Sequence, residues 1–334
     1  EGGVNRPALS PAHLEARAWY AAQVKQAGLA LEIDGAGNHS AILRCPNPPA
    51  PTLLLGSHLD SVPEGGRYDG ALGVVAALEV LRTIQEAGLN LPVHLEAIDF
   101  TDEEGTLVGF IGSGALTGTL TPHDLETPRG GRQALLAGLA RAGLSEDGLF
   151  TARRDPAALA GYLELHIEQG PRLYEAGVDI GVVSGIVGIA SYRLAFSGRA
   201  NHAGTTPMAA RRDAGLGAAS FILAARVLVM EAFPGCVANV GMLRLEPGAF
   251  NIIPGRAELA LECRADAPEV LERLQASLLE CAAREAEQYG LGLEVTPLSR
   301  DAPAPMSQPV QQAIESAAAD LGLSTQRMPS GAGH

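Results

Sequence analysis

The sequence has 334 residues, a length typical of two domains rather than one. Hydrophobic residues make up 46% of it, which is enough for well-packed cores, and the formal net charge of −14 argues against a nucleic-acid partner, because phosphate binding needs a basic surface. The cysteines are scattered without a C-x-x-C pair, and neither a signal peptide nor an uninterrupted apolar run of membrane-spanning length is visible. Composition therefore predicts a soluble cytoplasmic protein with no nucleic-acid or membrane partner.

The first elements of the chain alternate between helix and strand signals. Ser10 and Pro11 are typical of the N-cap and first turn of a helix, which is expected to run to about Ala27 and stop at Gly28. A turn at Asp34-Gly35 separates two short strands, the second over 41–45. The next apolar run, Leu53 to Leu55, is typical of a buried parallel strand, although its length alone does not exclude a helix.

Potential metal ligands follow this apolar run directly. His58 and Asp60 come at its carboxyl end, and Asp69 precedes Gly70, where a helix with a single apolar face is expected to run to Ala87. Open α/β sheets place their chemistry at the carboxyl ends of strands, and imidazole and carboxylate groups bind divalent metals such as zinc. Asp60 is also spaced to orient the His58 imidazole. A polar loop that happens to contain a histidine is the alternative interpretation.

Acidic residues and a histidine recur at two further predicted strands. The strand over 93–100 ends in Thr101-Asp102-Glu103-Glu104-Gly105, where the adjacent glutamates repel each other unless a cation or a shared proton relieves them. In 162–168, Glu164, His166 and Glu168 alternate with apolar residues, as on a strand. A solvated acidic turn explains either segment alone. The recurrence at three strands favours a site.

The second half of the chain has a different order of elements. From about Gly188 the expected order is β-α-β-β-α-β, that of a ferredoxin-like sandwich inserted into the first domain. A linker over 302–309 and a helix over 310–321 would return the chain to the first domain. The strands are expected at 190–196, 237–243, 256–264 and 291–298, and the helices at 212–231 and 268–289.

These segments together resemble the zinc-dependent amidase, hydantoinase and carbamoylase group of the M20 aminoacylase and carboxypeptidase superfamily. The resemblance rests on 56-GSHLDSV-62, 69-DGALGV-74, 101-TDEEG-105, 166-HIEQG-170, 201-NHAGTTPM-208, 251-NIIPG-255 and 331-GAGH-334. It implies an α/β, zinc-exopeptidase-like catalytic domain, over 1–187 and 299–334, whose mixed, mainly parallel sheet is flanked by helices. It also implies an inserted ferredoxin-like α+β domain, over 188–298, that serves as lid and dimerisation domain. Family members extend beyond both ends of this sequence, so both ends are expected to be truncated.

The resemblance also implies a centre with two divalent metal ions, Zn²⁺, Mn²⁺ or Co²⁺. Asp69 would bridge the two ions, and Glu103 would act as general base towards a metal-activated hydroxide. Asp60 would support His58. The implied metal ligands are His58, Asp69, Glu104, His166 and His334.

The family motifs also bear on the substrate. The histidine at position 166 is similar to that of the carbamoylase and allantoate branch of the family. Within that branch, the segments 99–105 and 112–118 resemble those of N-carbamoyl-L-amino-acid hydrolases. Thr106-Leu107-Val108 departs from the Arg-Phe pair of many members, so allantoate amidohydrolase and dipeptidase- or aminoacylase-like activities stay open. A scaffold without turnover is a further alternative, against which the retained Glu103 argues.

Substrate-binding residues are implied mainly in the inserted domain. His202 would stabilise the oxyanion, Arg264 would hold the substrate carboxylate, and Asn251 and Gln169 would be polar anchors. The resemblance implies a homodimer formed through the inserted domain, with His202 supplied by the partner subunit. Asn251 as a simple turn residue and Arg264 as a surface residue are the alternatives.

Overall fold

The computed structural model describes residues 2–331 and 333. Packing divides the chain into two compact units, one up to Gln169 and the other Gly170–Gly333. The predicted inserted domain, 188–298, falls wholly within the second unit. Its assignment as an insertion stays a prediction, and the predicted ligand His334 lies outside the described residues.

The first unit is built on a mixed sheet in the order β1-β2-β4-β3-β5. β3 is parallel to both of its neighbours, whereas β1, β2 and β4 pair antiparallel. The predicted α/β class with a mixed sheet is therefore confirmed, and β3, β4 and β5 point their carboxyl ends to one edge. The strands are β1 Ala30–Ile33, β2 His39–Leu43, β3 Thr52–His58, β4 His94–Phe100 and β5 Leu159–Leu163.

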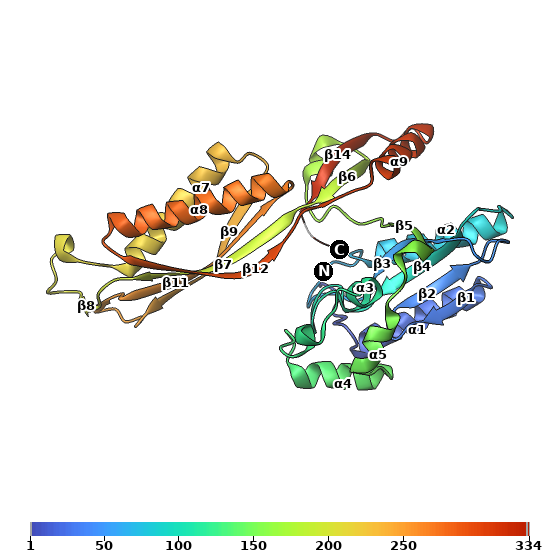
Figure 1. The fold of residues 1–334 in the computed structure, drawn as a ribbon, viewed down its shortest axis with the longest axis horizontal. Helices are drawn as coiled ribbons and strands as arrows, with labels where there is room; N and C mark the ends of the chain where they lie inside the picture. The colour runs from blue at the N-terminus through green and yellow to red at the C-terminus, as the bar shows by residue number, and fades with distance from the viewer. Residues whose placement is uncertain (1, 332, 334) are drawn as a thin grey trace. The chain divides into compact units, whose positions relative to one another are not determined.

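Helices flank this sheet (Figure 1). The side chain of Ser10 accepts a hydrogen bond from the backbone N–H of His13 and so caps the first helix, as predicted. The predicted apolar face of the second helix is Val74, Leu78, Leu81 and Ile84. The first three are buried in a core shared with the strands, and Ile84 packs against it partly buried. The helices are α1 Pro11–Gln26, α2 Ala71–Glu86, α3 Ile111–Thr117, α4 Arg132–Ala142 and α5 Glu146–Leu149.

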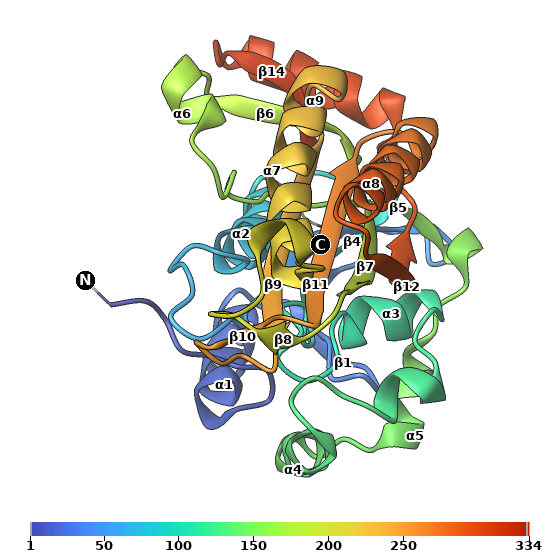
Figure 2. The ribbon, with the colours of Figure 1, turned by 90° about the vertical axis from the view of Figure 1, so that its left-hand side faces the viewer.

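The second unit contains a sandwich with the predicted β-α-β-β-α-β order. Its strands form one antiparallel sheet in the order β12-β7-β11-β9, and both helices cover the same face of it (Figure 2). Alternate residues of β11 are buried, among them Leu259 and Leu261, because only this face meets the helices. The elements are β7 Gly188–Ser197, α7 Ala214–Ala232, β9 Val237–Glu246, β11 Arg256–Ala265, α8 Pro268–Gln288 and β12 Gly292–Asp301.

The second unit also contains a small sheet in the order β13-β6-β14. The predicted return linker contains one of its strands, β13, and the predicted final helix is α9. The sequence analysis did not identify β6 or β14. The elements are α6 Arg172–Ala176, β6 Ile180–Ile186, β13 Ala304–Pro305, α9 Gln308–Asp320 and β14 Thr325–Ser330.

Among the described residues, α7 is long and apolar enough to cross a membrane by length and composition alone. The core helix of a globular domain meets the same criterion, and Phe221 and Ala225 of α7 are buried in the core of the sandwich. Arg226 and Glu231 fall within the helix and interrupt its apolar run. The predicted cytoplasmic location stays a prediction.

Candidate metal centre

The candidate site starts where β3, β4 and β5 end. His58, the last residue of β3, lies opposite Phe100 of β4, so the loops after both strands leave the sheet side by side. The predicted strand over 162–168 is wrong beyond Leu163, where the pairing of β5 with β3 ends. From there the Glu164 carboxylate accepts a hydrogen bond of 2.5 Å from Ser57 Oγ, so a side chain holds the chain to β3 in place of the backbone ladder.

The structure brings His58, Asp69 and His166 together. One potential ligand atom from each residue lies within 4.8 Å of the other two. His166 Nε2 is 3.1 Å from Asp69 Oδ1, and His58 Nε2 is 4.0 Å from the same oxygen. His58 and Asp69 are buried and His166 is half-buried, so the three groups form a largely enclosed cluster.

The hydrogen bonds of both imidazoles leave Nε2 as the potential ligand atom. His58 Nδ1 lies 3.1 Å from the carbonyl oxygen of Asp60, and His166 Nδ1 lies 2.8 Å from that of Ile167. A carbonyl only accepts, so each Nδ1 carries the proton, which leaves each Nε2 with a lone pair 3.1 to 4.0 Å from Asp69 Oδ1. Asp69 Oδ1 is buried and accepts no hydrogen bond from the described residues. Converging lone pairs of this kind fit a divalent metal ion.

Two glutamates add negative charge beside this cluster. Glu103 Oε2 lies 3.4 Å from His58 Nε2, and Glu104 Oε1 accepts a hydrogen bond of 3.4 Å from the Val62 N–H. Burial, reinforced by Asp69 and Glu103, raises the pKa of Glu104 against the opposing effect of His58. Burial lowers the pKa of His58, but the neighbouring carboxylates, Glu103 first, outweigh it and raise that pKa overall. Burial is thus the main cause of the Glu104 shift, whereas the carboxylates around His58 outweigh burial there.

Asp60 connects the loop after β3 to the loop after β4. Its carboxylate accepts backbone N–H bonds from Glu103 at 3.3 Å and from Glu104 at 3.2 Å, while its Oδ1 is 3.7 Å from His58 Nδ1. The His58 Nδ1 hydrogen bond therefore goes to the Asp60 carbonyl oxygen rather than to the carboxylate that the sequence suggested. Burial raises the pKa of Asp60 to about 7.

Gln169 also lies at the cluster. Its Nε2 donates a 2.7 Å hydrogen bond to Asp69 Oδ2, the carboxylate oxygen other than the one that faces the histidines. The residue considered as a substrate anchor therefore contacts a potential metal ligand directly.

The predicted substrate residues of the second unit fall into two places. β8, Asn201–His202, pairs with β10, Ile252–Ile253, and the carbonyl of Asn251 accepts a 2.9 Å bond from the Ala203 N–H, so His202 and Asn251 lie close together. His202 is exposed. Arg264 lies at the far end of β11, about 26 Å from Arg256 at about 3.3 Å per residue.

Arg264 has partners at that end of the strand. It donates hydrogen bonds to Glu262 Oε1 at 2.8 Å and to the carbonyl of Gly331 at 2.5 Å. Gly331 belongs to the terminal motif that carries His334.

Sequence reasoning assigned no role to Asp102. Its buried carboxylate accepts backbone N–H bonds from Leu107, Val108 and Gly109 at 2.7 to 3.0 Å, so the loop after Glu104 curls around it. The one feature of the sequence that could have indicated this role is the position of Asp102 directly before the two glutamates.

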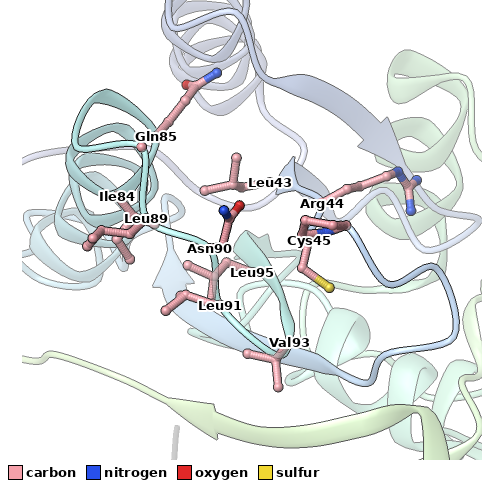
Figure 3. Close-up of a pocket in the computed structure, with 12 residues that line it drawn as sticks. Leu43, Arg44, Cys45, Ile84, Gln85, Leu89, Asn90, Leu91, Val93 and Leu95 are labelled. Atoms are coloured by element: carbon pink, nitrogen blue, oxygen red, sulfur yellow. The ribbon is translucent and has the colours of Figure 1, made fainter.

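A cavity of about 190 Å³ lies at the other end of β4 (Figure 3). Its lining includes Leu43, Cys45, Ile84 and Leu95 but none of the predicted site residues. This cavity is separate from the metal centre, because it adjoins the carboxyl end of α2 whereas Asp69 precedes the amino end.

Comparisons with known proteins identify the family. Residues 54–334 match the family model described as peptidase family M20/M25/M40. The chain is 39% identical to an N-carbamoyl-L-amino acid amidohydrolase of Geobacillus stearothermophilus, covering 100% of this chain and 82% of that protein. It is 31% identical to an allantoate amidohydrolase of Bacillus subtilis, covering 100% of this chain and 81% of that protein.

The fold is similar to that of a solved amidase of the hydantoinase/carbamoylase family from Burkholderia phymatum. The TM-score is 0.89 at 38% identity, over 99% of this chain and 82% of that structure. The family match covers most of the chain and includes His58, Asp69 and His166. The chain therefore belongs to the peptidase family M20/M25/M40.

Proposed function

We propose that this protein is a metal-dependent amidohydrolase that cleaves the carbamoyl C–N bond of N-carbamoyl-L-amino acids, releasing ammonia and carbon dioxide. The observation that carries the proposal is the convergence of His58 Nε2, His166 Nε2 and the buried Asp69 Oδ1. The relative named N-carbamoyl-L-amino acid amidohydrolase, at 39% identity over the whole chain, supports the substrate class.

Two divalent metal ions, Zn²⁺, Mn²⁺ or Co²⁺, are proposed for this centre, with Asp69 between them. When bound, such ions polarise a carbonyl oxygen and lower the pKa of water, which a poorly electrophilic ureido group requires. The position of Glu104 supports its inclusion, because burial and, to a lesser extent, Asp69 and Glu103 raise its pKa, and a cation would offset both effects. The proposed ligands are His58, His166, Asp69, Glu104 and His334.

Glu103 is the proposed general base. Its Oε2, 3.4 Å from His58 Nε2, borders the proposed ligands without being needed as one of them. From there the carboxylate takes a proton from the attacking water and delivers it to the leaving nitrogen. Asp60 holds the backbone N–H of Glu103 and thereby fixes the position of this base.

A substrate carboxylate would bind to the Arg264 guanidinium, with Gln169 and Asn251 as polar anchors and His202 stabilising the oxyanion. The loop of His202 and Asn251 leaves the sheet at the Arg256 end of β11, and Arg264 lies about 26 Å away along the strand from Arg256. A single N-carbamoyl amino acid is too small to reach both ends of the strand. The separation supports a homodimer in which His202 and Asn251 of one subunit complete the site of the other.

The sandwich offers an apolar surface for this dimer. Leu223, Val227 and Met230 follow one another along one side of α7 and are all exposed. Burial of such a stripe against a second copy is favourable, because it removes apolar area from water.

The second candidate is allantoate hydrolysis, which the 31% identity to the Bacillus subtilis allantoate amidohydrolase favours. Both candidate substrates carry a ureido group and a carboxylate, so the metal centre does not distinguish them. Dipeptidase- or aminoacylase-like hydrolysis is the remaining alternative.

A substrate screen tests the proposal. The protein is stripped with EDTA, reloaded with Zn²⁺, Mn²⁺ or Co²⁺, and assayed for product release from N-carbamoyl-L-methionine, allantoate and a dipeptide. We expect turnover of the N-carbamoyl amino acid that depends on metal and is lost in His58→Ala. Preferential hydrolysis of allantoate or the dipeptide would replace the substrate assignment, and activity that survives metal removal would refute the metal mechanism.

A further inference from the structure

A buried ion pair lies beside the loops that carry His58 and Glu103. Arg17 of α1 donates a 2.7 Å hydrogen bond from Nε to Asp99 Oδ2 of β4, and the two side chains are 2% and 0% exposed. Pairs of this kind add little net stability compared with apolar residues of similar size, because both charges lose their hydration. The further hydrogen bonds of the pair indicate a different role.

Asp99 binds the loop after β3. Its Oδ1 accepts a 2.7 Å hydrogen bond from the backbone N–H of Leu59, the residue between His58 and Asp60. The pairing of β3 with β4 ends at His58, so the buried Leu59 N–H has no ladder partner and needs this carboxylate. The bond fixes the peptide chain at the point where the Asp60 carbonyl accepts from His58 Nδ1.

Arg17 binds the loop after β4. Its Nη2 donates a 2.9 Å hydrogen bond to Thr101 Oγ1, two residues before Glu103. The backbone N–H of Thr101 is in turn held by Asn38 Oδ1 at 3.0 Å. One guanidinium therefore holds Asp99 with one nitrogen and the start of the glutamate-bearing loop with another.

We propose that Arg17, Asp99 and Thr101 are positioning residues that set the His58 loop and the Glu103–Glu104 loop at the spacing the metal centre requires. The inference rests on the proposed function, because it assumes that metal binds at His58, Asp69 and His166. None of these three residues is among the proposed metal ligands or substrate-binding residues. They act through the Leu59 peptide, the Asp60 carbonyl and the backbone at Thr101.

The principal variant is Asp99→Asn. An amide offers one oxygen where the carboxylate offers two, so it cannot accept from both Leu59 N–H and Arg17 Nε. Loss of such supporting hydrogen bonds typically lowers metal affinity by about 10–100-fold. We therefore expect the Kd for Co²⁺ or Zn²⁺, measured by calorimetry, to rise by about this factor, with a changed visible absorption spectrum of the Co²⁺ form.

The chain provides a matched control on the same strand. Glu96 of β4 is buried and binds Arg154 through both carboxylate oxygens, at 2.6 and 2.7 Å, without contacting either loop. Glu96→Gln also removes the carboxylate of an ion pair in this strand, although Arg154 is 26% exposed, so it reports the general cost of losing such a carboxylate here. We expect it to lower the melting temperature while leaving the metal Kd and the Co²⁺ spectrum unchanged.

If Asp99→Asn does not fold, substitutions of Thr101 test the positioning role instead. Thr101→Val removes the acceptor of Arg17 Nη2 at nearly constant shape, and Thr101→Ser keeps it. Weaker metal binding in the valine variant, restored in the serine variant, supports the proposal. Metal affinity within two-fold of wild type in folded Asp99→Asn and Thr101→Val refutes it, as does an equal loss in Glu96→Gln.

The same titration separates the two proposals. If wild-type protein binds no metal, or binds it equally well in His58→Ala and His166→Ala, the proposed metal centre itself is wrong and the positioning role falls with it. If metal binding requires both histidines but its Kd is unchanged in the Asp99 and Thr101 variants, only the positioning role is wrong.

Discussion

Replacing Gly70 by alanine tests how closely the amino end of α2 packs on the metal centre. Gly70 has φ +63° and ψ −47°, and the N–H of Ala71 bonds to the carbonyl of Asp69 at 2.6 Å, which closes a tight turn next to a proposed ligand. A β-carbon at this position would lie 2.3 Å from the carbonyl oxygen of His58 and 2.5 Å from its ring atoms Nδ1 and Cε1. The alanine therefore cannot fit unless His58 moves.

Gly88, at the other end of the same helix, is the matched control. Its φ is +62°, but a β-carbon there would meet nothing within 4 Å. Left-handed backbone costs alanine about 1–2 kcal/mol, which is the expected loss of stability in Gly88→Ala. Overpacking adds about 1–3 kcal/mol, so Gly70→Ala is expected to lose roughly 2–5 kcal/mol.

Urea denaturation measures both free energies of unfolding, and calorimetric titration with Zn²⁺ measures metal binding. We expect the Gly70 variant to be less stable than the Gly88 variant and to bind metal more weakly, because the displaced atoms belong to His58. Equal destabilisation of the two variants, with metal affinity unchanged in both, would refute this account of the His58 environment.

Three further predictions concern catalysis and pH. Glu103→Gln should keep its metal content, measured by atomic absorption, while kcat falls by about 10²–10⁴-fold; a wild-type kcat would place the base elsewhere. Arg264→Ala should raise KM for carboxylate-bearing substrates and His202→Ala should mainly lower kcat. Mixed His202→Ala and Glu103→Gln subunits should regain activity, and a mixture that stays inactive after demonstrated subunit exchange would contradict the shared site. Burial lowers the pKa of His13 from 6.5 to about 2. The unfolded chain therefore binds a proton that the native state excludes, so stability should fall by about 1.4 kcal/mol per pH unit below pH 6.5. His13→Gln should reduce that slope in urea titrations, and an unchanged slope would exclude His13 as its source.

Much of the candidate site was predictable from local sequence. Apolar runs that end in His58 and in Glu103-Glu104 indicate strands with ligands at their carboxyl ends, and parallel strands bring such ends to one edge of a sheet. Apolar residues at helical spacing after Gly70 likewise predicted α2. These features are local, because they depend on the spacing of residues along one strand or helix.

Other features were decided by contacts between residues far apart in the chain. The alternation over 162–168 predicted a longer strand, but β5 ends where its partner β3 stops pairing and Glu164 binds Ser57 instead. No local pattern marks Arg17 as the partner of Asp99, because a buried charge is tolerated only once tertiary packing supplies the opposite one. The separation of His202 from Arg264 is likewise fixed by the pairing of β8 with β10 and by the length of β11. The sequence by itself thus determined which residues end the strands, and only the tertiary structure decided what each of them touches, because hydrogen-bond partners and burial are set by the packing of distant segments.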